Sequence, residues 1–134
     1  MIYAAAYLGT GFGFLVLDII WLGFLAQPFY QREIGVLLLE KFNMGAAAAF
    51  YLMYIAGVVI FAVSPALHSG SWKTALVLGA LLGFFAYATY NLTNLATLKG
   101  WSMTMAMVDI SWGAVLTGLA ALFGYAVARM FAGN

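Results

Sequence analysis

Two acidic residues, Asp18 and Asp109, lie inside long apolar stretches of the sequence, in the segments LVLDIIW and MVDISWG. Acids within membrane spans are rare and commonly mark sites that bind ions or protons. The alternative is a structural acid that ties helices together by hydrogen bonds. Two carboxyl groups that lie close together at low dielectric are not expected to be ionised at the same time. The pair therefore predicts proton handling or cation binding.

Two amides, Asn91 and Asn94, follow a long apolar run, in the segment YATYNLTNLATLKGW at residues 87–101. An amide buried without a partner loses several kcal/mol of hydration, by a rough estimate. Both side chains are therefore expected to hydrogen-bond to other helices. They either belong to a binding site or act only as interhelical hydrogen bonds, each worth about 1 kcal/mol.

Three tyrosines, Tyr51, Tyr54 and Tyr87, accompany these groups within the apolar runs. They are candidates for the wall of a ligand pocket. The alternative is an aromatic belt, in which tyrosine and tryptophan side chains sit at the membrane interface.

The composition places the chain among integral membrane proteins. Of 134 residues, 66% are hydrophobic and only 7% are charged, against about 25% charged in soluble domains. The net charge of +1 comes with no basic patch, which excludes nucleic acid as a partner. The chain has no cysteine and only one histidine, His68, which excludes disulfides, thiol nucleophiles and thiolate or multi-histidine metal sites. We assign no cofactor and no catalytic residue, and we favour a protein that is not an enzyme.

Four apolar runs are long enough to span a bilayer. Between the first two lies a shorter, charged segment at residues 29–42, which predicts an amphipathic helix at the membrane interface. The fold class is therefore an all-α, integral membrane four-helix transmembrane bundle with one interfacial helix, in a single domain (1–134). The predicted spans are residues 3–26, 44–63, 73–98 and 102–131.

The second span is predicted to end at Ser64-Pro65, because proline interrupts helices. A polar loop holding His68 would then lead to Trp72. Four spans place both chain ends on one side of the membrane, here called the termini side. The turn at Lys99 lies on the other side, the Lys99 side.

Depth along the helices supports one polar layer. At 1.5 Å per residue, Asp18 lies ~8 Å from the Lys99 side of a core ~30 Å thick, and Asp109 lies ~10 Å from it. The amides and the tyrosines of the second span fall ~6 to 15 Å from the same side. Tyr87, Asn91 and Asn94 also share one face of the third span. All four spans therefore contribute polar groups to the Lys99 half.

The sequence also contains a short internal echo. DIIW at residues 18–21 resembles DISW at residues 109–112, and the two spans run in opposite directions. The echo suggests an inverted repeat, although a match of four positions also arises by coincidence.

Four segments carry a resemblance to a known family: LDIIWLG (17–23), FYLMYIAG (50–57), YATYNLTNLATLKGW (87–101) and VDISWG (108–113). They resemble the domain-of-unknown-function family 2177, small bacterial membrane proteins. In that family the position of Asn91 is usually aspartate, whereas this chain has an amide there. The resemblance implies four spans and a location in the bacterial inner (plasma) membrane as a multi-pass protein.

Three functions remain open. We rank first a carrier or binding protein for a small amphipathic or cationic molecule, with proton coupling through the polar layer. A carrier of this size would need to dimerise. The glycine pairs Gly9/Gly13 and Gly79/Gly83 permit close helix packing, and they could also provide the dimer interface. The second is an enzyme that modifies a membrane lipid, with an aspartate as general acid or base. The third is a structural subunit that binds partner membrane proteins.

Overall fold

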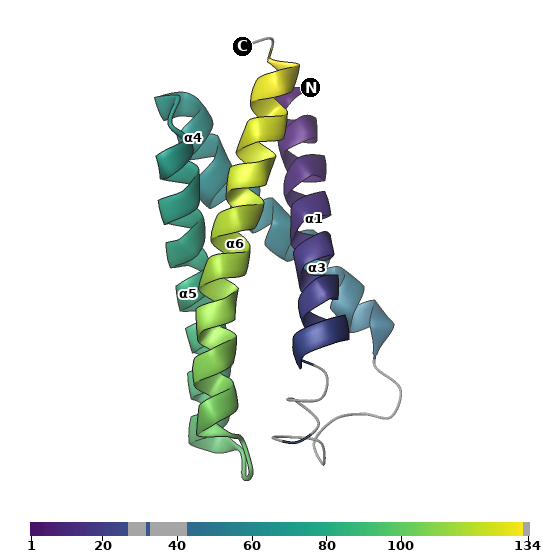
Figure 1. Cartoon of the computed structure of the whole chain (residues 1–134), viewed down its shortest axis with the longest axis vertical. Coiled ribbons are helices and arrows are strands. Elements are labelled where there is room, and N and C mark those ends of the chain that lie inside the picture. Colours follow the sequence, from purple (N-terminus) through teal and green to yellow (C-terminus); the bar gives the residue numbers. More distant parts are fainter. Residues whose placement is uncertain (27–31, 33–42, 133–134) are drawn as a thin grey trace.

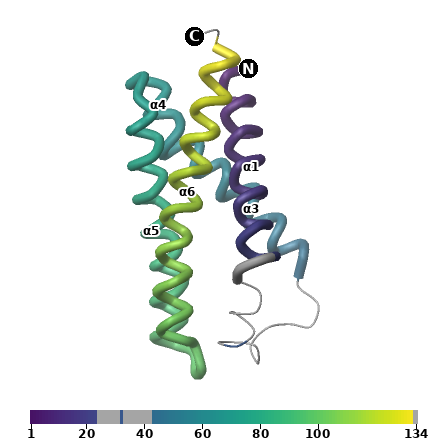
Figure 2. Tube along the Cα trace, in the orientation of Figure 1, coloured from purple at the N-terminus to yellow at the C-terminus, as the bar shows by residue number. Residues whose placement is uncertain are grey.

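The chain forms a bundle of antiparallel helices (Figure 1; Figure 2). The computed structural model describes residues 1–26, 32 and 43–132, and for residues 24–26 it describes the backbone alone. The predicted interfacial helix at 29–42 lies outside the described residues, apart from Arg32. The described helices are α1 (Ile2–Ile20), the π-helical η1 (Trp21–Ala26), α3 (Met44–Val58), the π-helical η3 (Val59–Val63), α4 (Ser64–Ser69), α5 (Trp72–Thr97) and α6 (Met103–Phe131).

Four of the described helical stretches are long and apolar enough to cross a membrane, by length and composition. They are Ile2–Gly23, Met44–Ser69, Trp72–Thr97 and Met103–Phe131. Both chain ends lie at the same end of the bundle (Figure 1). The all-α, four-span prediction is therefore confirmed.

The second span does not end at Ser64-Pro65, as predicted from the sequence, but continues to Ser69. In η3 the amide of Ser64 bonds to the carbonyl of Val59, and Pro65 then occupies the first turn of α4, where no amide donor is needed. Gly70, at φ 71°, ends this helix. His68 consequently lies in the last turn of a helix and not in a loop.

Helix α6 is the centre of the bundle, because α5 and α1 both pack along it. Two glycines of α5 make this approach close. A Cβ at Gly79 would lie 2.8 Å from the Ala121 Cβ, and one at Gly83 would lie 2.2 Å from the Gly113 carbonyl oxygen.

The glycine pairs are therefore not free to form a dimer interface, as the sequence had suggested. Gly79 and Gly83 face α6 of the same chain. Gly9 and Gly13 also face α6, with Val127 and Phe123 as their neighbours. Small residues let two backbones approach, and here both pairs serve contacts within the chain.

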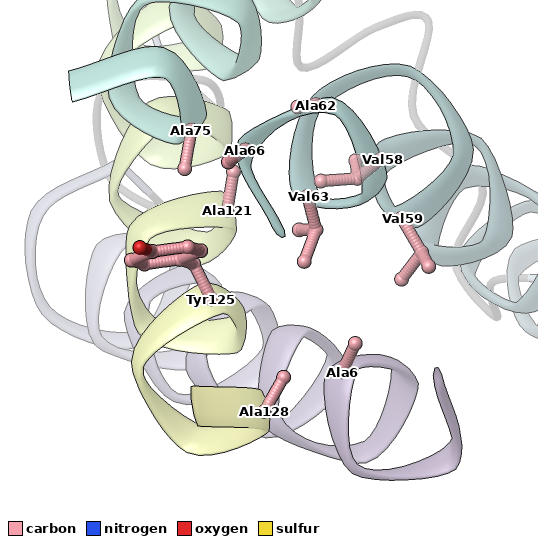
Figure 3. Close-up of a cluster of buried hydrophobic side chains, with 10 residues drawn as sticks. All are labelled: Ala6, Val58, Val59, Ala62, Val63, Ala66, Ala75, Ala121, Tyr125 and Ala128. Atoms are coloured by element: carbon pink, nitrogen blue, oxygen red, sulfur yellow. The ribbon is translucent and has the colours of Figure 1, made fainter. Parts of the chain in front are cut away.

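The larger cluster of buried apolar side chains, drawn in Figure 3, lies in the half of the bundle that holds the chain ends. It is built largely of alanine and valine, so the helices come close together there. Its members are Ala6, Val58, Val59, Ala62, Val63, Ala66, Ala75, Ala121, Tyr125 and Ala128. The buried carboxyl and amide groups lie in the other half, towards Lys99.

Candidate functional site

Both intramembrane aspartates are buried inside the bundle. Asp18 on α1 and Asp109 on α6 are each only 9% exposed, and their carboxyl groups lie close enough to interact electrostatically. Asp18 accepts a hydrogen bond from the hydroxyl of Tyr51 on α3. The aspartates thus lie on the inner faces of two adjacent helices.

Asn91 connects α5 to α6 and is fully buried. Its Nδ2 donates to Asp109 Oδ2 at 2.7 Å and to the carbonyl of Tyr87 at 2.9 Å. Its Oδ1 accepts a bond from Trp101 Nε1 at 3.3 Å. The amide therefore holds Asp109 in place, which meets the expectation that it would find a partner on another helix.

Asn94 does not join this arrangement. It is half-buried, and its side chain takes no part in the hydrogen bonds described for the chain. Three residues beyond Asn91, it is rotated by about 60° around α5 and lies about one turn nearer the helix end. Shared spacing along the helix was therefore not enough to place both amides at the same contact.

Tyr54 and Tyr51 are held by the same aromatic residue. The rings of Tyr51 and Tyr54 each pack edge-on against Phe14, which is fully buried, with centroids 5.6 and 5.5 Å away. The Tyr54 hydroxyl also shares a 2.8 Å hydrogen bond with the hydroxyl of Thr117 on α6. These contacts fix the tyrosines of α3 against α1 and α6.

Tyr87 lies at the centre of the layer. Its ring occupies the space that a side chain at Gly113 would need, since a Cβ there would lie 2.1 Å from the Tyr87 Cγ. Its phenol group lies within electrostatic reach of Asp18, Asp109 and both tyrosines of α3. Six of the seven residues proposed from the sequence therefore gather in one region, Asn94 being the exception.

A cavity of about 320 Å³ opens beside these groups. The described residues that line it come from α3, α5 and α6: Phe50, Ala86, Tyr87, Tyr90 and Asp109. Among the described lining residues, Asp109 carries the acidic group and the others are aromatic or apolar. Among the described residues, no three histidine, cysteine or acidic side chains converge as they would at a metal centre.

Sequence reasoning missed Phe50 as a lining residue. Phe50 precedes Tyr54 by four positions and therefore shares its helix face, which was the available signal. Sequence reasoning also missed Trp101, whose indole donates to Asn91.

The DIIW and DISW segments face each other across α1 and α6. Trp21 and Trp112 stack with their rings 4.5 Å apart and inclined by 11°. The Trp112 Nε1 atom is buried and makes no well-formed hydrogen bond. It nevertheless lies close to the carboxyl group of Asp18. The echo thus corresponds to a local pairing of the two helices.

Comparison with known proteins gives a single positive result. No curated protein and no solved structure matches the chain. Residues 3–126 match a family described as a predicted membrane protein family, DUF2177. This range contains the second and third spans, all but the outer ends of the first and fourth spans, and every residue of the polar layer. The chain, a multi-pass membrane protein, belongs to the DUF2177 family.

Proposed function

We propose that this protein binds a small organic cation in the cavity beside Asp109 and serves as its carrier. The observation that supports this function is the lining of that cavity, in which one buried carboxyl group stands among the rings of Phe50, Tyr87 and Tyr90. Aromatic faces attract cations, by about 0.5–2 kcal/mol each. A carboxylate adds a charge that is poorly screened at low dielectric.

The second carboxyl group supplies a reason for proton coupling. Two negative charges in one buried layer are costly, so we expect a proton to compensate part of that charge when no cation is bound. A bound cation would take over that compensation, and the proton would leave. The hydrogen bond that Tyr51 donates to Asp18 holds this second carboxyl group in the layer, on the α1 side.

The setting proposed for this activity is the bacterial inner membrane, which the family resemblance supports. Membrane lipid is the surrounding partner. A homodimer, or a complex with another membrane protein, would need a surface other than the two glycine pairs, since these face α6 of the same chain.

The test is a titration with tetramethylammonium in detergent, followed by intrinsic fluorescence and by pH in weak buffer. We expect saturable binding with proton release. Asp109→Asn should lower the affinity at least about tenfold, or ~1.4 kcal/mol. Ser111→Ala, an exposed polar change two residues away on α6, should leave it unchanged. Absence of both binding and proton release at every pH would refute the proposal.

The other two functions predict different outcomes. A lipid-modifying enzyme would change the mass spectrum of a lipid extract incubated with the protein, and Asp109→Asn would abolish that change. A structural subunit would co-purify with a partner and would tolerate Asp18→Asn.

A further inference from the structure

We infer that the ligand of the Asp109 cavity is an amphipathic cation that enters sideways from the membrane, between α3 and α5, and leaves its apolar tail in the lipid. This inference rests on the proposed function and specifies its ligand class and its route. Four observations support it: the exposure of the residues that line the cavity, the divergence of α3 from α5, the depth of the opening in the membrane and the size of the cavity.

Exposure increases across the cavity from one side to the other. Asp109 is 9% exposed, whereas Phe50 and Tyr90, which line the same cavity, are 46% and 54% exposed. The buried carboxyl group therefore lies at the inner end, and the two exposed rings mark the mouth.

The mouth lies where two helices separate. Helix α5 packs against η3, near the middle of the second span. From there α3 runs obliquely, so that its Met44 end lies well away from the lower end of α5 (Figure 1; Figure 2). Phe50 belongs to α3 and Tyr90 to α5, so the mouth faces the space between these helices.

Depth places this mouth in the hydrocarbon, close to the headgroups. Tyr90 and Asp109 lie seven and six residues from the Lys99-side ends of α5 and α6, or ~9–10 Å at the helical rise. Helix α5 has 26 residues, is therefore ~39 Å long, and extends ~5 Å beyond each face of a core ~30 Å thick. The mouth thus lies ~5 Å inside the core.

This depth suits a molecule with a charged head and an apolar tail. The tail of such a molecule lies among acyl chains, and its head stays near the interface, at the level of Asp109. A strictly water-soluble cation would have to leave water to reach the same opening.

The size of the cavity limits what can enter it completely. About 320 Å³ is near the lower end of the volumes of small-molecule sites, roughly 300–1,000 Å³. A trimethylammonium head fits among three rings and one carboxyl group. A long alkyl chain attached to it has to remain outside, which only a sideways mouth permits.

The test uses wild-type protein in phosphatidylcholine nanodiscs with trimethylammonium probes that carry methyl, hexyl or decyl chains. Binding is followed by fluorescence, and each dissociation constant is corrected for the independently measured partitioning of the probe into empty nanodiscs. We expect the corrected constants of the hexyl and decyl probes to agree within about threefold, since further methylenes exchange lipid for lipid. Asp109→Asn should weaken the binding of all three probes. Ser111→Ala should leave the binding of all three unchanged.

Two results would overturn the inference, and they are distinguishable. If the methyl probe binds but the corrected constant of the decyl probe is at least about tenfold weaker, the cavity is closed to the membrane and only the route is wrong. If no probe binds beyond its partitioning, the proposed function fails as well.

Discussion

Removing the hydroxyl of Tyr51 should destabilise the bundle more than removing that of Tyr54. Tyr51→Phe deletes the donor to the buried carboxyl group of Asp18, and Tyr54→Phe deletes a bond to the neutral hydroxyl of Thr117. The two tyrosines are a matched pair, because both are half-buried on α3 and both pack edge-on against Phe14. The ring contacts survive in each variant, so the difference reports the hydrogen bonds.

The magnitude follows from the acceptor and from its burial. A hydrogen bond to a charged group contributes about 1.5–3 kcal/mol in soluble proteins. Interhelical bonds in membranes average about 0.6 and reach about 1.7 kcal/mol, because the unfolded chain also finds partners. Asp18 is 9% exposed and little water can replace the lost donor. We therefore expect Tyr51→Phe to lower the free energy of unfolding by about 1–2 kcal/mol and Tyr54→Phe to lower it by about 0.5 kcal/mol.

The assay is a double-mutant cycle with Asp18→Leu, measured by reversible unfolding in mixed micelles. Tyr51→Phe should show a coupling energy with Asp18→Leu of about 1 kcal/mol, and Tyr54→Phe should add to it within about 0.3–0.5 kcal/mol. Equal coupling for both tyrosines, or none for Tyr51, would contradict the assignment of the Tyr51–Asp18 bond as a distinct contact between α1 and α3.

Two further predictions concern α5. Gly83→Ala should lower the free energy of unfolding by about 1–3 kcal/mol, because its Cβ would lie 2.2 Å from a carbonyl oxygen of α6. Gly57→Ala has nothing within 4 Å of the added carbon and should be tolerated. Equal melting temperatures for the two variants would argue against the close helix contact. Asn91→Leu should cost about 1–3 kcal/mol, since it removes the donor to the carboxyl group of Asp109, and Asn94→Leu less than about 0.5 kcal/mol. A larger loss for Asn94→Leu in chemical unfolding would place that amide within the network after all.

Much of the site was predictable because depth in a membrane is a local property. Helical rise converts a position in the sequence into a distance along the membrane normal. Asp18, Asp109 and Asn91 could therefore be assigned to one layer before any contact was known. Their burial followed from the cost of exposing such groups to hydrocarbon.

The extent of the second span was less predictable, because a proline has two different effects. In a regular helix it interrupts the hydrogen bonds, but after a π-helical turn Pro65 occupies a first turn where no donor is missing. Nothing in the sequence around Val59–Val63 marks that turn.

The sequence by itself determined the membrane class, the four spans and the depth of the polar groups, since hydrophobic length and helical rise act within each span. Tertiary structure decided that Tyr51 hydrogen-bonds to Asp18, that Asn91 rather than Asn94 hydrogen-bonds to Asp109, and that the glycine pairs pack against α6. These contacts depend on how far each helix is rotated and how it crosses its neighbours. Side-chain packing among all four spans sets both quantities, and no single span contains that information.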